Sequence, residues 1–237
     1  MITFAIVHFN TPELTSCLCG SILKNHPDSK IVIFDNSTCR PFDKDLFMNV
    51  VYYDNTNGQI INFDKELQKY PEREIDNQKN SGCNFGSVKH SLSIEWLCNN
   101  LNENFVLLDS DVLLKRPIDF IDENYICISD TIKVYEKYRM SPMMAYINVS
   151  KMKENNIHFF DGKRMHSLTK TMFKYDTGMS FYEDCCKVNL FKKINSKEYI
   201  EHYGNGSWRN NHHQLTDKSY KNISAKEWLI ILRDLWK

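Results

Sequence analysis

The chain has 237 residues, of which 42% are hydrophobic and 25% charged, and its 30 basic and 30 acidic side chains give a formal net charge of zero. This length and composition suit a globular protein of one large domain, or of one domain with a small appendage. Because a broad nucleic-acid surface needs an excess of Lys and Arg, we expect no nucleic-acid partner.

The cysteines and the start of the chain indicate the compartment. The eight cysteines include no Cys-x-x-Cys pair, which argues against a zinc ribbon. Residues 1–9 are apolar but have no basic leader and no small-residue cleavage site, and they are too few to span a bilayer. We interpret them as the first strand of a cytoplasmic protein with reduced thiols.

Strand and helix patterns alternate through the first third of the chain. Residues 2–9, 30–34 and 50–53 predict strands, and Thr11-Pro12 predicts the start of a helix, with Thr as N-cap and Pro at the first helical position. Polar residues follow each strand. In open α/β sheets ligands bind beyond those strand ends.

A polar stretch and a second helix follow. Residues 59–80 are weakly patterned and predict a loop or a short helix, and residues 80–86 form a turn-rich lead-in to a helix that carries Val88, Leu92 and Trp96. A small-residue loop that opens a helix can turn backbone N–H groups toward a phosphate. A plain loop with an N-cap is the alternative.

The stretch 105–114 is central to the prediction, because two carboxylates interrupt its apolar run at Asp109 and Asp111. The run predicts a buried strand, and in extended backbone residues i and i+2 point to the same side. Buried ionised groups need a partner or a metal, and Mg²⁺ and Mn²⁺ take oxygen ligands that often include a substrate phosphate. A turn or helix cap at the end of the strand is the alternative.

The second half has weaker patterns. Residues 125–129 predict a strand, and residues 143–149 predict another at the edge of the sheet or crossing it. Further on, a helix is expected at 163–174, a turn at 176–178, a Gly-rich and aromatic loop at 199–209, and an apolar helix at 225–237. That last helix suits core packing, or contact with a membrane surface or a partner.

With these residues in place, the chain resembles GT-A glycosyltransferases of the inverting family-2 type over about residues 1–210. Asp109-Ser110-Asp111 is similar to the Asp-x-Asp metal motif of that family, and Glu183-Asp184 is similar to its Glu-Asp pair, in which the Asp is the catalytic base. One departure is Asp176-Thr177-Gly178, which stands where the family has Gly-Gly before the acceptor region.

The resemblance implies a set of site residues. The expected metal ligands for Mn²⁺ or Mg²⁺ are Asp109, Asp111 and His202, and the catalytic candidates are Asp184 as base and Glu183 as its competitor. Phe181, Tyr182 and the two following cysteines give Asp184 an apolar setting, which we expect to raise its pKa. Two acids that cap a helix beginning near residue 183 are the alternative. The expected nucleotide-sugar-binding residues are Asn10, Asp35, Asn36, Asn80, Gly82, Lys89, Asp109, Ser110, Trp208 and Arg209.

The fold implied is α/β of the GT-A type, with a mostly parallel central sheet flanked by helices. We expect a domain at 1–210, with a nucleotide-binding half at about 1–112 and an acceptor half at about 113–210, and a C-terminal helical segment at 211–237. The protein would act in the cytoplasm or at the inner face of the membrane, which the C-terminal helix would contact.

The function implied is transfer of a sugar, with inversion, from a nucleotide-diphosphate donor, most simply a UDP-sugar. The acceptor would be a saccharide or a lipid-linked saccharide, in bacterial surface polysaccharide or lipopolysaccharide synthesis. A sugar nucleotidyltransferase is one rival, but the loop after the first strand has no Gly and no basic residue. A non-catalytic saccharide-binding module is another, and metal-dependent hydrolysis through His202, His212 and His213 is a third.

Overall fold

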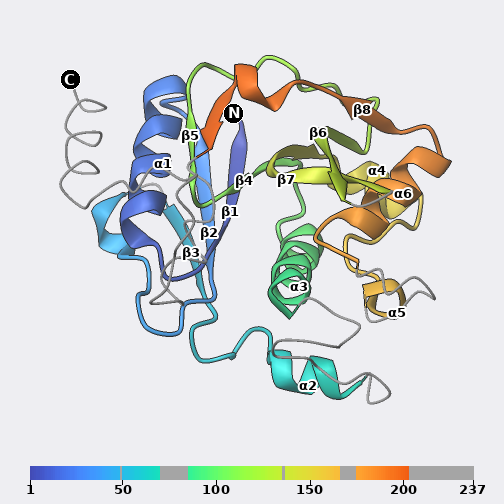
Figure 1. Ribbon diagram of the computed structural model, residues 1–237. Coiled ribbons are helices and arrows are strands. Elements are labelled where there is room, and N and C mark those ends of the chain that lie inside the picture. The colour runs from blue at the N-terminus through green and yellow to red at the C-terminus, as the bar shows by residue number, and fades with distance from the viewer. Residues whose placement is uncertain (49, 70–84, 135–136, 166–174, 203–237) are drawn as a thin grey trace.

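The computed structural model describes residues 1–48, 50–69, 85–134, 137–165 and 175–202 (Figure 1). The predicted helix at 225–237 and the division of the chain near residue 210 lie outside these ranges. The strands are β1 (Thr3–His8), β2 (Lys30–Asp35), β3 (Val50–Asp54), β4 (Phe105–Asp109), β5 (Val112–Leu114), β6 (Cys127–Val134), β7 (Lys137–Ile147), β8 (Phe191–Lys193) and β9 (Ile200–His202). The helices are α1 (Pro12–Asn25), α2 (Phe63–Gln68), α3 (Phe85–Asn100), α4 (Val149–Glu154), α5 (Gly162–Met165) and α6 (Met179–Lys187), with 3-10 turns at Lys44–Leu46 and Ser196–Glu198.

One large sheet organises the described residues. Its strand order is β3-β2-β1-β4-β7-β6-β8, and β5 and β9 form a separate two-stranded sheet. The pairs β1–β2, β1–β4, β2–β3 and β6–β8 are parallel, whereas β7 is antiparallel to both of its neighbours. The predicted α/β fold with a mostly parallel central sheet and flanking helices is confirmed.

Two apolar layers cover the two faces of this sheet. Alternate residues of a strand point to opposite faces, so Phe4 and Ile6 of β1 pack in the layer under α1, whereas Ala5 packs in the layer that includes residues of α3 and α6. Figure 1 shows α1 on one side of the strands and α3 on the other.

The start of α1 differs from the prediction in one detail. The helix begins at Pro12 with Thr11 as its N-cap residue, as expected, but the Thr11 side chain makes no capping hydrogen bond. Its hydroxyl instead lies 3.2 Å from the hydroxyl of Ser110. This contact joins the loop after β1 to the turn after β4.

The stretch 105–114 is not one strand, so the expectation that extended backbone aligns Asp109 with Asp111 was wrong. β4 ends at Asp109, a turn follows, and β5 leaves the large sheet to pair with β9. The reason lies in α1, because the backbone N–H of Leu114 donates to the Ser21 hydroxyl at 3.0 Å, and Asn25 donates to the Leu114 carbonyl. Contacts with α1 therefore draw the chain away from the sheet immediately after Asp109.

The position of β7 also differs from the prediction. Residues 143–149 were expected at the edge of the sheet or crossing it, but β7 lies inside the sheet between β4 and β6. It is consecutive with β6 and antiparallel to it, the relation that a short connection requires. The alternative that a helix begins near residue 183 was wrong as well, because α6 begins at Met179 after Gly178.

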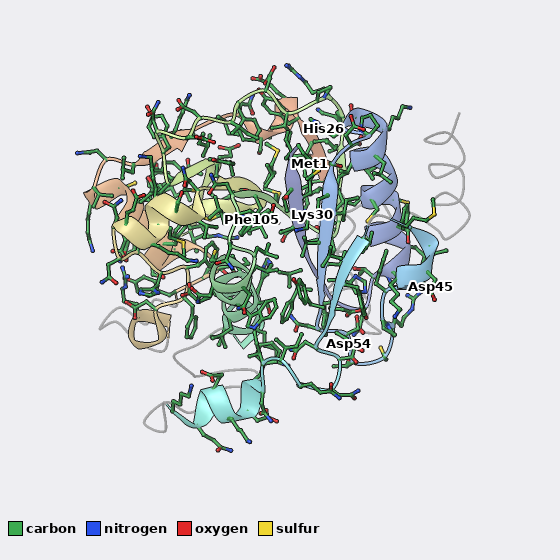
Figure 2. The ribbon with its side chains drawn as sticks, turned by 180° about the vertical axis from the view of Figure 1, so that it is seen from behind. Met1, His26, Lys30, Asp45, Asp54 and Phe105 are labelled. Atoms are coloured by element: carbon green, nitrogen blue, oxygen red, sulfur yellow. The ribbon has the colours of Figure 1, made fainter. Side chains whose placement is uncertain are left out.

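The carboxyl ends of the parallel strands lie together at one edge of the sheet. Figure 2 shows Met1 and Lys30 near the amino ends, and Asp54, at the end of β3, at the opposite edge. An open pocket of the described residues lies at the amino ends, where Met1, Lys30 and Val50 line it. The carboxylates of the predicted site lie at the other edge, where α/β folds bind their ligands.

Candidate active site

Asp111 and His202 are brought together by the small sheet. Val112 of β5 pairs with His202 of β9, which places the imidazole beside Asp111, the residue that precedes β5. Nε2 of His202 lies 3.4 Å from Oδ1 of the buried Asp111. Burial lowers the pKa of His202, but the hydrogen bond and charge of Asp111 outweigh burial and raise the pKa overall.

Asp109 is bordered by a second histidine from α3. Nε2 of His90 lies 3.6 Å from Oδ1 of Asp109. Burial lowers the pKa of His90, so the imidazole is neutral near pH 7. The pKa of Asp109 is raised, first by burial and then, against the effect of His90, by the charge of Asp111. Buried carboxylates whose charges repel one another favour a cation between them.

Arg139 and Asp176 complete this group of charges, and the sequence analysis did not assign them to the site. Nη2 of Arg139 lies 3.4 Å from Oδ2 of Asp176, and Nη1 donates to the Thr177 carbonyl at 3.1 Å. Both charges act on His90, and that of Arg139 also acts on Asp109. A sequence signal existed for each: an Arg beside a buried apolar segment of β7, and an Asp where the family pattern has Gly-Gly.

Asp35, predicted to bind the nucleotide, is enclosed by the protein. It is fully buried, and its two oxygens accept hydrogen bonds from Ser37 N at 2.7 Å, Phe42 N at 2.8 Å and the Tyr52 hydroxyl at 2.8 Å. Burial and the Asp35 carboxylate raise the pKa of Tyr52. The carboxylate therefore shapes the loop after β2, while its role in nucleotide binding stays a prediction.

Asn10 and Asn36 also hold loops at this edge. Asn10 has a positive φ of 53°, and its Oδ1 accepts the backbone N–H groups of Thr38, Cys39 and Arg40 at 3.0–3.1 Å. Asn36 donates to the Ser93 hydroxyl at 2.8 Å, which links β2 to α3, and accepts from Asn55. These amides join the loops after β1, β2 and β3 into one surface.

The other predicted nucleotide-sugar residues are placed in part. Nζ of Lys89 lies 5.3 Å from the ring centroid of Phe63, and burial lowers the pKa of this lysine. Ser110 lies against Thr11, as described above. Four predicted residues lie outside the described part of the chain: Asn80, Gly82, Trp208 and Arg209.

Asp184 lies on α6 in an ion-pair network. The guanidinium of Arg164 donates to both of its oxygens, with Nη1 at 3.1 Å from Oδ1, and Lys187 donates to Oδ1 at 2.9 Å. Burial raises the pKa of Asp184, but the hydrogen bonds of Arg164 and Lys187 outweigh it, and the pKa is lowered. The expectation of a raised pKa was wrong because Arg164, which is twenty positions away in sequence, and Lys187, one helical turn further on, outweigh the apolar neighbours.

Glu183 belongs to the same network. It accepts from Lys137 at 2.7 Å and from the Tyr175 hydroxyl at 3.1 Å, and Nη1 of Arg164 lies 3.5 Å away. These contacts tie α6 to the start of β7 and to α5. Glu183 and Asp184 are thus paired with cations, and this network is separate from the contacts that Asp109 and Asp111 make.

The donors at the end of β4 suit a hard divalent cation in their chemistry. Two carboxylates and an imidazole are ligand types that Mn²⁺ accepts, and Mg²⁺ shares the carboxylates. Asp111 and His202 lie side by side, and Asp109 acts on His202 through its charge. In the described residues, however, no group of three or more His, Cys, Asp or Glu side chains converges closely enough to hold a metal ion.

Comparisons with solved structures show which fold this is. LgtC, described as a galactosyltransferase and solved with donor and acceptor sugar analogues, is 12% identical over 83% of this chain and 74% of its own, with a TM-score of 0.49. An active-site mutant of LgtC gives a TM-score of 0.50 at 12% identity, over 92% of this chain and 81% of its own. The glycosyltransferase GlyE of Streptococcus pneumoniae gives 0.52 at 10% identity, over 99% of this chain and 63% of its own.

The comparisons rest on structure alone. No family model matches the sequence, and no curated protein matches it. At these identities the likeness shows the fold, which is the α/β architecture of GT-A glycosyltransferase structures. What the chain does has to be argued from the residues at its site.

Proposed function

We propose that the protein is a glycosyltransferase that moves a sugar from a nucleotide-diphosphate donor, most simply a UDP-sugar, to a saccharide hydroxyl with inversion. The observation that carries the proposal is the position of Asp109 and Asp111 at the carboxyl end of β4, with His202 against Asp111, in a chain with the GT-A fold. A bacterial surface polysaccharide or a lipid-linked saccharide is the acceptor class that we propose.

The donor diphosphate binds at the edge where β1 and β4 end. Asp109, Asp111 and His202 would hold Mn²⁺ or Mg²⁺ there, and the ion would supply Lewis-acid stabilisation of the charge that develops on the departing diphosphate. His90 lies beside Asp109, with 3.6 Å between Nε2 and Oδ1. Arg139 provides a positive charge in the same cluster, which acts on Asp109.

The loops after β1, β2 and β3 form the nucleotide side of this edge. Asn10 and Asn36 fix those loops through their hydrogen bonds, so we propose that the base and ribose contact the loop backbone and the exposed polar groups of the loops. The remaining proposed contacts of the nucleotide sugar are Lys89 and four residues outside the described ranges, Asn80, Gly82, Trp208 and Arg209.

The described helices include none that is long and apolar enough to cross a membrane.

Glu183 and Asp184 stay proposed residues of the acceptor side. A carboxylate that accepts from Arg164 and Lys187 is a weak base, so Asp184 can take a proton only if the acceptor displaces part of this network. Glu183, tied to Lys137 and Tyr175, is under the same constraint. Their present contacts favour a role in holding α6 in position for the acceptor.

The test is a panel of nucleotide sugars, incubated with the purified chain and Mn²⁺ and with a set of saccharide acceptors. Transfer is followed by release of the nucleoside diphosphate, and the anomeric configuration of the product is read by NMR. We expect transfer from a UDP-sugar with an inverted product. A retained configuration would contradict inversion, and binding of saccharide without any turnover would support the non-catalytic alternative.

A further inference from the structure

Asp176 lies in the same group of charges as Asp109, although it is far from it in sequence. We propose that Asp176 is the base that takes the proton from the acceptor hydroxyl; this assignment rests on the proposed function. Its side chain is 27% exposed, so the carboxylate is open to solvent at the edge of the cluster.

Asp176 is held in one orientation by its hydrogen bonds. Its Oδ1 accepts the hydroxyl of Ser87 at 2.5 Å and the backbone N–H of Thr177 at 2.8 Å. Its Oδ2 has a longer contact, 3.4 Å, with Nη2 of Arg139. One oxygen is thus fixed by neutral donors, while the other faces the cluster with one distant cation, which leaves it able to accept a further proton donor.

The helix α3 links Asp176 to the donor side of the site. Ser87 and His90 are three residues apart on α3, so they lie on the same helix face, with Cβ atoms about 5–6 Å apart. Ser87 contacts Asp176, and His90 contacts Asp109. One face of α3 therefore contacts both carboxylates, through Ser87 at Asp176 and through His90 at Asp109.

The cluster also contains a buried hydrogen-bond donor without an acceptor. The Nε–H of Arg139 is buried and has no hydrogen-bond acceptor among the described residues. Nη1 and Nη2 of the same guanidinium face Thr177 and Asp176. A buried donor without an acceptor is costly in a folded protein, and an oxygen of the bound substrates is the partner that would satisfy it.

The carboxylates of Asp176 and Asp184 differ in the hydrogen-bond donors that they accept from. Both oxygens of Asp184 accept from charged donors of Arg164, and Oδ1 also accepts from Lys187. Charge-assisted hydrogen bonds are shorter and about twice as strong as neutral ones, so they hold this carboxylate in its ionised and engaged form. Asp176 has one such partner at the longer distance of 3.4 Å.

The step balances as a single displacement. The acceptor oxygen attacks the anomeric carbon of the donor sugar and forms the new C–O bond, while the bond from that carbon to the diphosphate oxygen breaks and its electron pair leaves with the diphosphate. The proton of the acceptor hydroxyl passes to Oδ2 of Asp176. No oxidant, reductant or further reactant is needed.

The experiment compares Asp176→Asn with Asp184→Asn, and uses Asp122→Asn as the matched control. The Asp122 side chain is 29% exposed and pairs with Lys192 at 3.2 Å, so the control removes a carboxylate of similar exposure and pairing. Three quantities are measured for each variant: the shift in melting temperature with UDP and Mn²⁺, kcat for the saccharide acceptor, and the rate of transfer to azide, an anion that attacks without losing a proton.

We expect Asp176→Asn to keep the UDP shift and the azide rate while kcat for the saccharide falls about 10²–10⁴-fold, the usual contribution of a general base. Ser87→Ala, which keeps the carboxylate but loosens it, should give a smaller fall in kcat. The assignment is overturned if Asp176→Asn transfers to the saccharide at the wild-type rate, or if its azide rate falls equally. A wild-type chain that shows neither a UDP shift nor transfer would instead reject the proposed function itself.

Discussion

His202 lies against Asp111, 3.4 Å from Nε2 to Oδ1, because the pairing of β5 with β9 sets residue 202 opposite residue 112. The histidine reaches the carboxylate over ninety-one positions of sequence through two strands of three residues each. If this pair holds a divalent ion, His202→Ala should weaken Mn²⁺ binding by at least about 10-fold, because even loss of a partner behind a metal ligand typically costs that much. Titration of Mn²⁺ in the presence of UDP measures the effect, and unchanged affinity would remove His202 from the metal site.

Asp35→Asn should destabilise the fold rather than weaken nucleotide binding directly. The substitution puts an amide N–H₂ group where a buried carboxylate accepts three hydrogen bonds, from Ser37, Phe42 and Tyr52. Loss of such bonds should lower the free energy of unfolding by about 2–4 kcal/mol. Urea denaturation measures the change. A variant of wild-type stability that no longer binds UDP would instead support the sequence-based prediction that Asp35 binds the nucleotide.

Arg164→Gln should show how much the ion pairs on α6 contribute to the free energy of unfolding, and how that contribution depends on pH. At pH 7 the loss of the charged hydrogen bonds to Asp184 should cost about 1–3 kcal/mol. Because the pKa of Asp184 is lowered in the folded chain, its stabilisation is complete above the ordinary Asp value of about 3.9 and is lost as pH falls through the folded-state pKa.

The corresponding measurement is urea denaturation of the wild type and Arg164→Gln at pH 7 and at several values below 4. The difference between the two proteins should be largest at pH 7 and should shrink as Asp184 becomes protonated in the folded state. A difference that stays constant over the whole range would mean that Arg164 acts through packing instead of through this ion pair.

Gly178→Ala should destabilise the start of α6. Gly178 has a φ of +74°, which non-glycine residues rarely adopt, and an added Cβ would lie 2.5 Å from Cγ of the buried Met140. We expect a loss of about 1–3 kcal/mol in the free energy of unfolding. Thermal denaturation of Gly178→Ala and of the double variant with Met140→Ala separates the two causes, since the smaller side chain removes the clash but not the backbone strain. Wild-type stability in the single variant would contradict both.

The sequence predicted those parts of the fold that depend on local patterns. Strands β1, β2 and β3, the start of α1 at Pro12, and the presence of a helix at α3 follow from apolar periodicity and helix-start residues. The end of β4 at Asp109 did not, because it depends on hydrogen bonds between Leu114 and residues of α1 that are about ninety positions away. The internal position of β7 likewise depends on its pairing with both β4 and β6, which local patterns do not reveal.

The site was predicted unevenly for a similar reason. Asp109, Asp111 and His202 were marked by residue type and setting, and the structure brings Asp111 and His202 together while their metal-binding role stays a prediction. The sequence signals at Arg139 and Asp176 were too weak to assign these residues to the site, and only the packing of β7 against α6 and the turn before it makes them neighbours. The surroundings of Asp184 were misjudged because Arg164 is twenty positions away.

The most direct measurement of the central claim is calorimetric titration of UDP into the wild-type chain and into Asp111→Asn, each with and without Mn²⁺. If the acidic edge after β4 holds a nucleotide diphosphate through a divalent ion, the wild type binds UDP tightly only with Mn²⁺, and Asp111→Asn loses that enhancement while keeping the wild-type melting temperature. Equal UDP affinity with and without Mn²⁺, in both proteins, would contradict the account.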